Sequence, residues 1–308
     1  MQMGKTTFVN RKIMSFAVAV TVSIAAALTA PVTAAVADTP PPAEPMIVGG
    51  HPAASAPAGI TSLQYDAPAH GAKYVNYHTC GGALVFRGWV VTAAHCVADP
   101  PAGAASGSTT RRFAADSAPI PTADKTFHVR VGSLDRLSGG ETATVTKIVV
   151  HPGWNWAQGA PKRQVSDIAM LKLDHLLQQP TVQLARDTAR RGSTISLYGW
   201  GVTEPDSTSA DLPLHLQQLD TRVTAPSRCA DAAMSVGEVC TDNPSGTDGS
   251  CYGDSGGPAL ARVNGVQQLV GGASRAATEF CGTVPDVYTS SPDFRDWIYH
   301  VARTGNAT

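Results

Sequence analysis

The chain has 308 residues, of which 43% are hydrophobic and 15% are charged, and its formal net charge is −1. This length and apolar content can bury a sizeable core, in one large domain or two smaller ones. Because the chain has no basic surplus, the strong electrostatic attraction that nucleic acids and anionic membranes require is excluded, and we expect neither as a partner.

Residues 1–37 have the pattern of a secretory signal peptide. Three basic residues precede an apolar run over 14–30, and small residues follow as far as Ala37. We expect cleavage after Ala37. A permanent membrane anchor is the alternative, but the run is short, rich in Ala and Thr, and ends at a proline. The sequence therefore predicts a secreted, extracellular protein.

The next segment, 38–46, contains four prolines. Proline removes a backbone donor and fixes φ, so the segment can form neither a helix nor a central strand. We interpret it as a short extended linker.

The six cysteines indicate three disulfides, because export leads to an oxidising compartment. Their number alone leaves 15 pairings open. Metal ligation is the competing interpretation, but the chain has no CxxC pair. We expect no metal and no cofactor.

Short apolar runs separated by Gly, Pro, Asn and Asp fill residues 60–173. The runs at 80–94 and 142–150 are expected to be strands, and such spacing indicates an all-β sandwich or barrel. Residues 98–123 break the pattern, being dominated by Ala, Pro, Gly, Ser and Thr, and are expected to form a surface loop.

The C-terminal segment has a different period. Phe294, Trp297, Ile298 and Val301 recur at the spacing of one helical face, and Ser291 is a suitable cap in front of a proline. The sequence therefore predicts a C-terminal helix that packs on the β structure.

Three stretches carry chemistry. Residues 90–96 read Val-Val-Thr-Ala-Ala-His-Cys, 167–173 read Asp-Ile-Ala-Met-Leu-Lys-Leu, and 253–258 read Gly-Asp-Ser-Gly-Gly-Pro. In this order of His, Asp and Ser, the chain resembles the chymotrypsin and trypsin family of secreted serine proteases, of the bacterial trypsin-like type. The resemblance extends over 47–302, and only the long segment 98–123 has no counterpart.

The resemblance implies an all-β fold of two six-stranded antiparallel β-barrels that meet at the active site, with a C-terminal helix. It also implies three disulfides, which are Cys80 with Cys96, Cys229 with Cys240, and Cys251 with Cys281. The expected partners are protein or peptide substrates, an activating protease and protein inhibitors, and the expected oligomeric state is a monomer.

The resemblance also assigns the catalytic residues. Ser255 would be the nucleophile, His95 the base that accepts its proton, and Asp167 the carboxylate that orients the imidazole. The backbone N–H groups of Gly253 and Ser255 would form the oxyanion hole. The other eight histidines lie in no comparable motif, and we assign none of them a role.

The tetrapeptide Ile-Val-Gly-Gly at 47–50 resembles the new N-terminus of the family's activated zymogens. The resemblance implies that 38–46 is a short propeptide and 47–308 a single protease domain of two β-barrel halves. Cleavage after Met46 would free the α-amino group of Ile47 to pair with Asp254. Breaking such a buried pair typically costs about 3 to 5 kcal/mol, so it can act as a switch. A protease that prefers Arg or Lys would not cut after Met46, so we expect another protease to activate the chain.

The specificity pocket departs from the family. Gly249 stands where trypsin-type members have an aspartate, whereas Asp286 stands on the opposite wall, where a glycine is common. We expect Asp286 to favour Arg or Lys before the scissile bond, less sharply than in trypsin. If Asp286 instead points away or is neutral, the pocket lined by Gly249, Ser250 and Tyr252 would have chymotrypsin- or elastase-like specificity.

The entrance of that pocket is also unusual, since Ser274-Arg275-Ala276 stands where the family usually has Ser-Trp-Gly. We expect Ser274 to contact substrate. Arg275 would repel cationic substrates or attract acidic residues further along the peptide.

Two other functional classes are disfavoured. A non-catalytic binding protein can share this fold, but such relatives lose catalytic residues and here all three are present. Lipases and esterases also use Ser, His and Asp, but with a different nucleophile motif and chain order.

Overall fold

The structure is a computed structural model that describes residues 47–99, 120–155, 165–204, 212–278 and 280–308. The expected signal peptide and propeptide, and most of segment 98–123, lie outside the described residues. The described strands are β1 His51–Pro52, β2 Ile60–Asp66, β3 Tyr77–Phe86, β4 Trp89–Thr92, β5 Thr126–Val131, β6 Glu141–Val150, β7 Ala169–Leu173, β8 Gln183–Leu184, β9 Thr194–Gly199, β10 Gln217–Arg222, β11 Glu238–Thr241, β12 Pro258–Val263, β13 Val266–Ala276 and β14 Asp286–Ser290.

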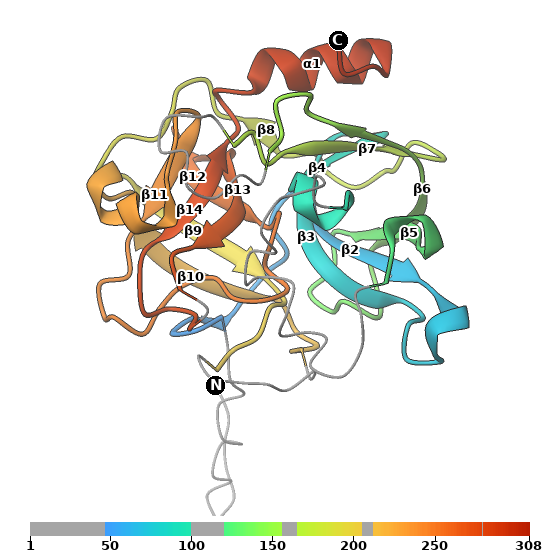
Figure 1. The fold of residues 1–308 in the computed structure, drawn as a ribbon, viewed down its shortest axis with the longest axis horizontal. Helices are drawn as coiled ribbons and strands as arrows, with labels where there is room; N and C mark the ends of the chain where they lie inside the picture. The colour runs from blue at the N-terminus through green and yellow to red at the C-terminus, as the bar shows by residue number, and fades with distance from the viewer. Residues whose placement is uncertain (1–46, 100–119, 156–164, 205–211, 279) are drawn as a thin grey trace, which may run out of the picture. The chain divides into compact units, whose positions relative to one another are not determined.

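The first half of the domain is a closed antiparallel barrel with the strand order β2-β3-β4-β7-β6-β5 (Figure 1). Its strands bury alternate side chains; along β5, for example, Phe127, Val129 and Val131 face the core. The runs at 80–94 and 142–150 correspond to β3 with β4 and to β6, so both strand predictions are confirmed.

The second half is an antiparallel sheet with the order β1-β10-β9-β12-β13-β14-β11, to which β8 adds a parallel edge beside β13. An isolated bridge between Val223 and Thr241 joins the end of β10 to β11. The six strands from β9 to β14 therefore close into a second ring, with β1 and β8 as additions. This confirms the predicted two-barrel fold.

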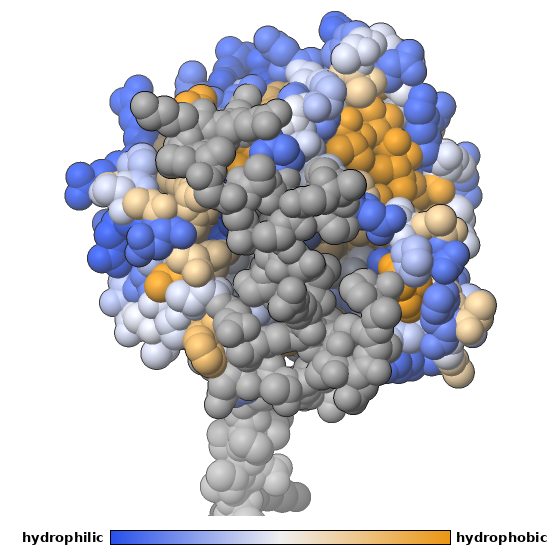
Figure 2. All heavy atoms as spheres, in the orientation of Figure 1, coloured by the Kyte–Doolittle hydropathy of each residue, from blue (hydrophilic) through white to orange (hydrophobic). Residues whose placement is uncertain are grey.

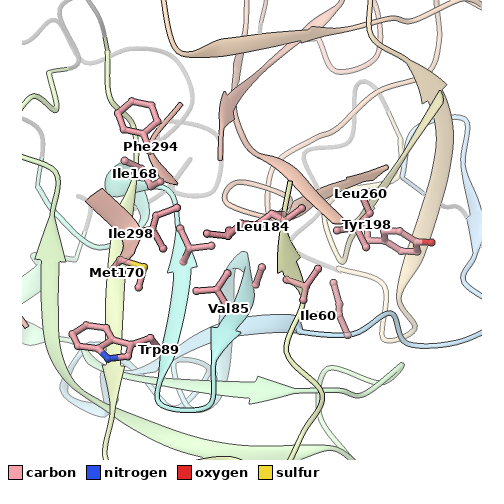
Figure 3. Close-up of a cluster of buried hydrophobic side chains, with 14 of the residues drawn as sticks. Ile60, Val85, Trp89, Ile168, Met170, Leu184, Tyr198, Leu260, Phe294 and Ile298 are labelled. Atoms are coloured by element: carbon pink, nitrogen blue, oxygen red, sulfur yellow. The ribbon is translucent and has the colours of Figure 1, made fainter. Parts of the chain in front are cut away.

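A cluster of buried apolar side chains lies where the two halves meet (Figure 3). Ile60 and Met170 come from the first barrel, and Tyr198 and Leu260 come from the second. Such shared burial stabilises the two halves against each other, because separating them would expose apolar surface to water.

The C-terminal helix α1, Arg295–Thr304, is confirmed, and it buries Ile298 and Val301 in the same cluster. Its first residue lies later than the expected cap indicates, because Phe294 is the N-cap. Ser291 does not cap the helix; its hydroxyl donates a hydrogen bond to the carbonyl of Leu269 in β13, 2.6 Å away. The hydroxyl that could have capped α1 therefore bonds to a neighbouring strand.

Among the described residues in Figure 2, polar side chains surround much of the margin of this face, and apolar side chains gather toward the upper right. Among the described residues, no helix combines the length and hydropathy that crossing a membrane would require.

Candidate active site

His95 and Asp167 meet because their strands are antiparallel neighbours. Thr92 ends β4 and stands opposite Ala169, which begins β7, so the residues after β4 and before β7 leave the barrel at the same edge. His95 lies on the short turn Ala94–Cys96, and its Nδ1 is 2.7 Å from Asp167 Oδ2. Its backbone N–H donates to Asp167 Oδ1 over 3.0 Å.

Asp167 is fully buried, yet the pKa of its carboxyl is lowered. Burial acts to raise this pKa, but the charge of His95 and the hydrogen bonds from His95 and Ser274 outweigh it. An ionised carboxylate can only accept, so the proton of the imidazole lies on Nδ1. Nε2 is then the ring nitrogen whose lone pair can accept a proton, as a general base for a nucleophile requires.

The backbone around Asp167 is fixed from the second barrel. Thr289 in β14 donates to the Asp167 carbonyl over 3.0 Å, and Ser274 in β13 donates to Asp167 Oδ2 over 2.7 Å. Ser166 precedes it with a φ of 48°, a left-handed conformation that is uncommon for a residue with a side chain. These contacts hold the carboxylate beneath the imidazole despite the local backbone strain.

Ser255 lies in a pair of tight turns, closed by hydrogen bonds from Asp254 N to Cys251 O at 2.9 Å and from Gly257 N to Asp254 O at 2.7 Å. The Ser255 carbonyl accepts the N–H of Gly81, 2.8 Å away. It also lies 3.7 Å from Sγ of Cys96, the residue next to His95. The serine loop of the second barrel is therefore packed against the histidine turn of the first.

The three disulfides are those expected, namely Cys80–Cys96, Cys229–Cys240 and Cys251–Cys281. The first fixes the histidine turn to β3. The sulfurs of Cys80 and Cys96 lie close to a nitrogen of His95, a grouping that resembles a metal site. Both sulfurs are already bonded to each other, so they are not available as thiolate ligands.

Gly253, two residues before Ser255, has a backbone conformation that few other residues adopt. Its φ of 99° favours glycine, and an added Cβ would lie 3.0 Å from Cα of Gly201. Within the described ranges, neither the N–H of Gly253 nor that of Ser255 donates a hydrogen bond to the protein. Backbone amides that have no acceptor within the protein can donate to a developing oxyanion.

His78, to which the sequence assigned no role, supports this loop. It is buried, and burial lowers its pKa to about 3, so the imidazole is neutral. Its Nδ1 is 2.8 Å from Ser62 Oγ, and its Nε2 is 3.0 Å from the Gly253 carbonyl, which requires the proton on Nε2. No local motif marks His78, because its partner lies 175 residues away in the sequence.

Asp254, the residue before Ser255, has its side chain buried in the protein. Its two oxygens accept the N–H groups of Gly201 and Cys251, at 2.8 and 2.9 Å. Burial raises its pKa to about 7, and no cation of the described residues lies against it. Ile47 is 1% exposed, and the next residue, Val48, accepts the N–H of Gly249 over 3.0 Å.

A cavity beside Ser255 is lined by Ser250, Tyr252, Ser274 and Asp286, among others. Asp286 Oδ2 accepts the backbone N–H and the hydroxyl of Ser250, at 2.7 and 2.9 Å. Gly249 lies behind this carboxylate, and an added Cβ there would come within 2.9 Å of Asp286 Oδ2. Asp286 therefore occupies the space that a side chain at 249 would need.

Asp286 is 3% exposed, and its pKa is raised to about 7. Burial is the largest cause, the hydrogen bonds of Ser250 oppose it, and the charges of Asp254 and Asp248 add to it. Both a charged and a neutral pocket are thus accessible near neutral pH.

Arg275 lines the cavity beside Ser255, but its charge is already paired, which the sequence did not predict. Its guanidinium forms an ion pair with Glu238, with Nη1 2.6 Å from Oε1, and the Arg275 side chain is only 10% exposed. This pairing with Glu238 offsets the positive charge and leaves it less able to attract or repel a charged substrate.

Comparison with known proteins adds to this geometry. The sequence model of the family described as Trypsin matches residues 47–298. The chain belongs to the trypsin family. Trypsin beta of Drosophila erecta is 30% identical over 73% of this chain and 79% of its own length. Chymotrypsin-like elastase family member 1 of Macaca fascicularis is 32% identical over 72% of this chain and 78% of its own length.

Among solved structures, neuropsin, described as a serine protease expressed in the limbic system of mouse brain, has a TM-score of 0.62 at 23% identity. It covers 82% of this chain and 98% of its own. This likeness supports the two-barrel fold. As a member of the trypsin family, the chain is a serine endopeptidase, a hydrolase whose substrates are proteins or peptides.

Proposed function

We propose that this trypsin-family protein is a secreted endopeptidase that is made as a zymogen and cleaves peptide bonds through an acyl-enzyme. In the proposed first step, Ser255 Oγ attacks the scissile carbonyl carbon while His95 Nε2 takes its proton. The tetrahedral intermediate then collapses, the C–N bond breaks, and His95 returns the proton to the departing amine. A water molecule then gives a proton to His95 Nε2 and attacks the ester carbonyl; the bond between Ser255 Oγ and the carbonyl carbon breaks, the new carboxyl group leaves, and His95 returns the proton to Ser255 Oγ.

The observation that carries this proposal is the contact of 2.7 Å between His95 Nδ1 and the buried carboxylate of Asp167. The carboxylate stabilises the imidazolium that forms in each step. The oxyanion would bind to the N–H groups of Gly253 and Ser255, each worth about 3 to 4 kcal/mol of barrier in related hydrolases.

We propose that Asp286 favours Arg or Lys before the scissile bond. Support comes from its place in the lining of the cavity beside Ser255 and from the two hydrogen bonds of Ser250, which hold one of its oxygens. A pKa of about 7 makes this preference broader than that of an acid which is always ionised. The second candidate is chymotrypsin- or elastase-like specificity, which a protonated Asp286 would favour.

Activation is proposed to follow cleavage after Met46 by a different protease. The freed α-amino group of Ile47 would pair with Asp254, whose buried carboxylate has two N–H donors but no cation among the described residues. Without such a cation the carboxylate is uncompensated, so the loop that carries Gly253 and Ser255 would be less stable in the zymogen. Protein inhibitors and a monomeric state remain part of the same proposal, as does secretion through residues 1–37.

The test is to prepare the chain with Ile47 at its N-terminus and to treat it with an aryl phosphonate that labels active-site serines. We expect one adduct on Ser255, together with cleavage of fluorogenic peptides. The Ser255→Ala variant and the unprocessed chain are the matched controls, and both should remain unlabelled. A processed chain that neither reacts nor cleaves any peptide would favour the non-catalytic binding protein.

A further inference from the structure

The buried ion pair between Arg275 and Glu238, which no sequence motif predicts, lies next to the candidate triad. Arg275 in β13 uses all five N–H donors of its guanidinium, with acceptors at 2.6 to 3.3 Å. Two go to the oxygens of Glu238, two to the carbonyls of Ala232 and Ala233, and one to Ser274 Oγ. Fully used donors in a planar fork fix the position of the guanidinium.

The contact with Ser274 leads directly to the candidate triad. Arg275 Nη1 donates to Ser274 Oγ over 3.3 Å, and Ser274 Oγ donates to Asp167 Oδ2 over 2.7 Å. A serine hydroxyl has one proton to donate. Because the Arg275 N–H occupies a lone pair of that oxygen, the hydroxyl proton is directed toward Asp167.

A second branch reaches the same segment from the opposite side. Glu238 Oε2 accepts both the N–H and the hydroxyl of Ser235, at 2.6 and 3.0 Å. The oxygen of Ser235 in turn accepts the N–H of Val165 over 3.3 Å, two residues before Asp167. The hydrogen bonds thus form a ring from Asp167 through Ser274, Arg275, Glu238 and Ser235 to the backbone at 165.

The backbone of β13 explains how neighbouring residues can take part in one network. The pairing with β14 shifts register between Ala273 and Arg275, which leaves Ser274 as the extra residue of a bulge. In a regular strand, successive side chains point to opposite faces, whereas a bulge redirects one of them. Ser274 can therefore reach Asp167 while Arg275 reaches Ser274.

We propose that the Arg275–Glu238 pair is a positioning device for the reaction, which holds the carboxylate of Asp167 against His95 through Ser274 and Ser235. This inference rests on the proposed function of Asp167 and His95. Arg275 and Glu238 touch no reacting atom, so they are positioning residues. The arginine at the pocket entrance thus orients the triad and does not bind substrate charge.

The test measures the His95 Nδ1 proton by NMR at low field, which requires no substrate. The main variant is Arg275→Met/Glu238→Met, since removing both partners leaves no uncompensated buried charge. We expect the signal to move upfield and to exchange with water about tenfold faster, because the hydrogen bond to Asp167 is less firmly held. The milder variant Arg275→Lys, which cannot reproduce the five-donor fork, should change the signal in the same direction.

Kinetics on a single-residue amide that occupies only the primary pocket provide the second readout. We expect kcat to fall about tenfold with KM changed less than about twofold, because positioning acts in the transition state. Ser274→Ala should produce the same loss, and adding the Met/Met change to it should have little further effect, since both act through one hydroxyl. Arg228→Met, which breaks a solvent-exposed ion pair with Asp242, is the matched control and should change neither readout.

Three outcomes would overturn the inference: an unchanged Nδ1 signal in both variants, losses that add fully to those of Ser274→Ala, or a change confined to KM. The last would indicate a role in substrate binding alone. If the wild-type protein cleaves nothing, the proposed function fails, while the NMR comparison still decides whether the pair positions His95 and Asp167.

Discussion

Changing Asp286 to Asn tests the proposed specificity most directly. The substitution keeps the volume of the side chain and lets its oxygen accept the two donors of Ser250, which now lie 2.7 and 2.9 Å from Oδ2. The amide nitrogen then replaces the other carboxylate oxygen of a side chain that lines the cavity. A cationic substrate loses a charged partner and meets an N–H donor.

The magnitude follows from the burial of the site. Asp286 is 3% exposed, so solvent screens its charge little. A hydrogen bond to a charged group is worth about 1.5 to 3 kcal/mol, which corresponds to a loss of about 10- to 150-fold in kcat/KM for Arg and Lys substrates. Leu and Phe substrates, which gain nothing from the charge, should change less than about threefold.

The pH dependence gives an independent check. The pKa of Asp286 is raised to about 7, so the free pocket gains its charge as pH rises through neutrality. The ratio of kcat/KM for an Arg substrate to that for a Leu substrate should therefore increase between pH 6 and pH 8, by up to about tenfold. Taking the ratio cancels the ionisations that both reactions share, and in Asp286→Asn it should be flat.

The assay is a panel of fluorogenic peptides that differ only in the residue before the scissile bond. Asp248→Asn is the matched control for the preference at pH 8, because this carboxylate is also buried but accepts the N–H and hydroxyl of Ser245, at 3.1 and 2.6 Å. Its charge helps to raise the pKa of Asp286, so this variant should keep the preference for Arg while the pH at which the preference appears moves lower. A preference for Arg that survives Asp286→Asn, or a ratio that does not change with pH, would refute the role of Asp286.

Three further predictions concern stability and the triad. Burial raises the folded-state pKa of Asp286 above its unfolded value of 3.8, so its contribution to wild-type stability falls as pH rises from about 4 to 7. In denaturant titrations, Asp286→Asn should therefore increase the free energy of unfolding by about 2 to 4 kcal/mol at pH 8 and leave it unchanged at pH 4. Asp167→Asn should lower kcat about 10⁴-fold with folding retained, a magnitude taken from serine proteases of this family, and unchanged turnover would contradict the proposed mechanism. Replacing Cys251 and Cys281 with Ser opens a loop with a separation of 30 residues and should reduce the free energy of unfolding by about 2 to 4 kcal/mol, where an unchanged denaturation midpoint would count against it.

The sequence predicted well what local patterns encode. The strands β3, β4 and β6 follow from apolar runs between turn residues, and His95 and Ser255 lie in contiguous motifs of the family. The pairing of the disulfides needed the family resemblance, because six cysteines alone leave many arrangements open. The helix cap was wrong, since Ser291 bonds to Leu269, which is distant in the sequence but adjacent in the fold.

Contacts between distant residues are what the sequence could not supply. Glu238, the partner of Arg275, lies 37 residues away and has no motif around it. The sequence therefore predicted that Arg275 interacts with the substrate, and the ion pair was missed. His78 was left without a role for the same reason. At Asp286, the residue type was visible but the direction of its side chain was not, so two specificities stayed open at that point.

The packing of Asp286 against Gly249 also constrains how such a pocket can change during evolution. The Cβ of a side chain at 249 would lie 2.9 Å from Asp286 Oδ2, so an acid at 249 would crowd the carboxylate already at 286, and neighbouring carboxylates resist being ionised together. A lineage that transfers the acid from one wall to the other one substitution at a time must pass through an ancestor with a crowded, half-protonated pocket or one with no acid. Intermediates of either kind would have relaxed selectivity. Moving the acid from one side of the pocket to the other would therefore involve a period of broad substrate specificity.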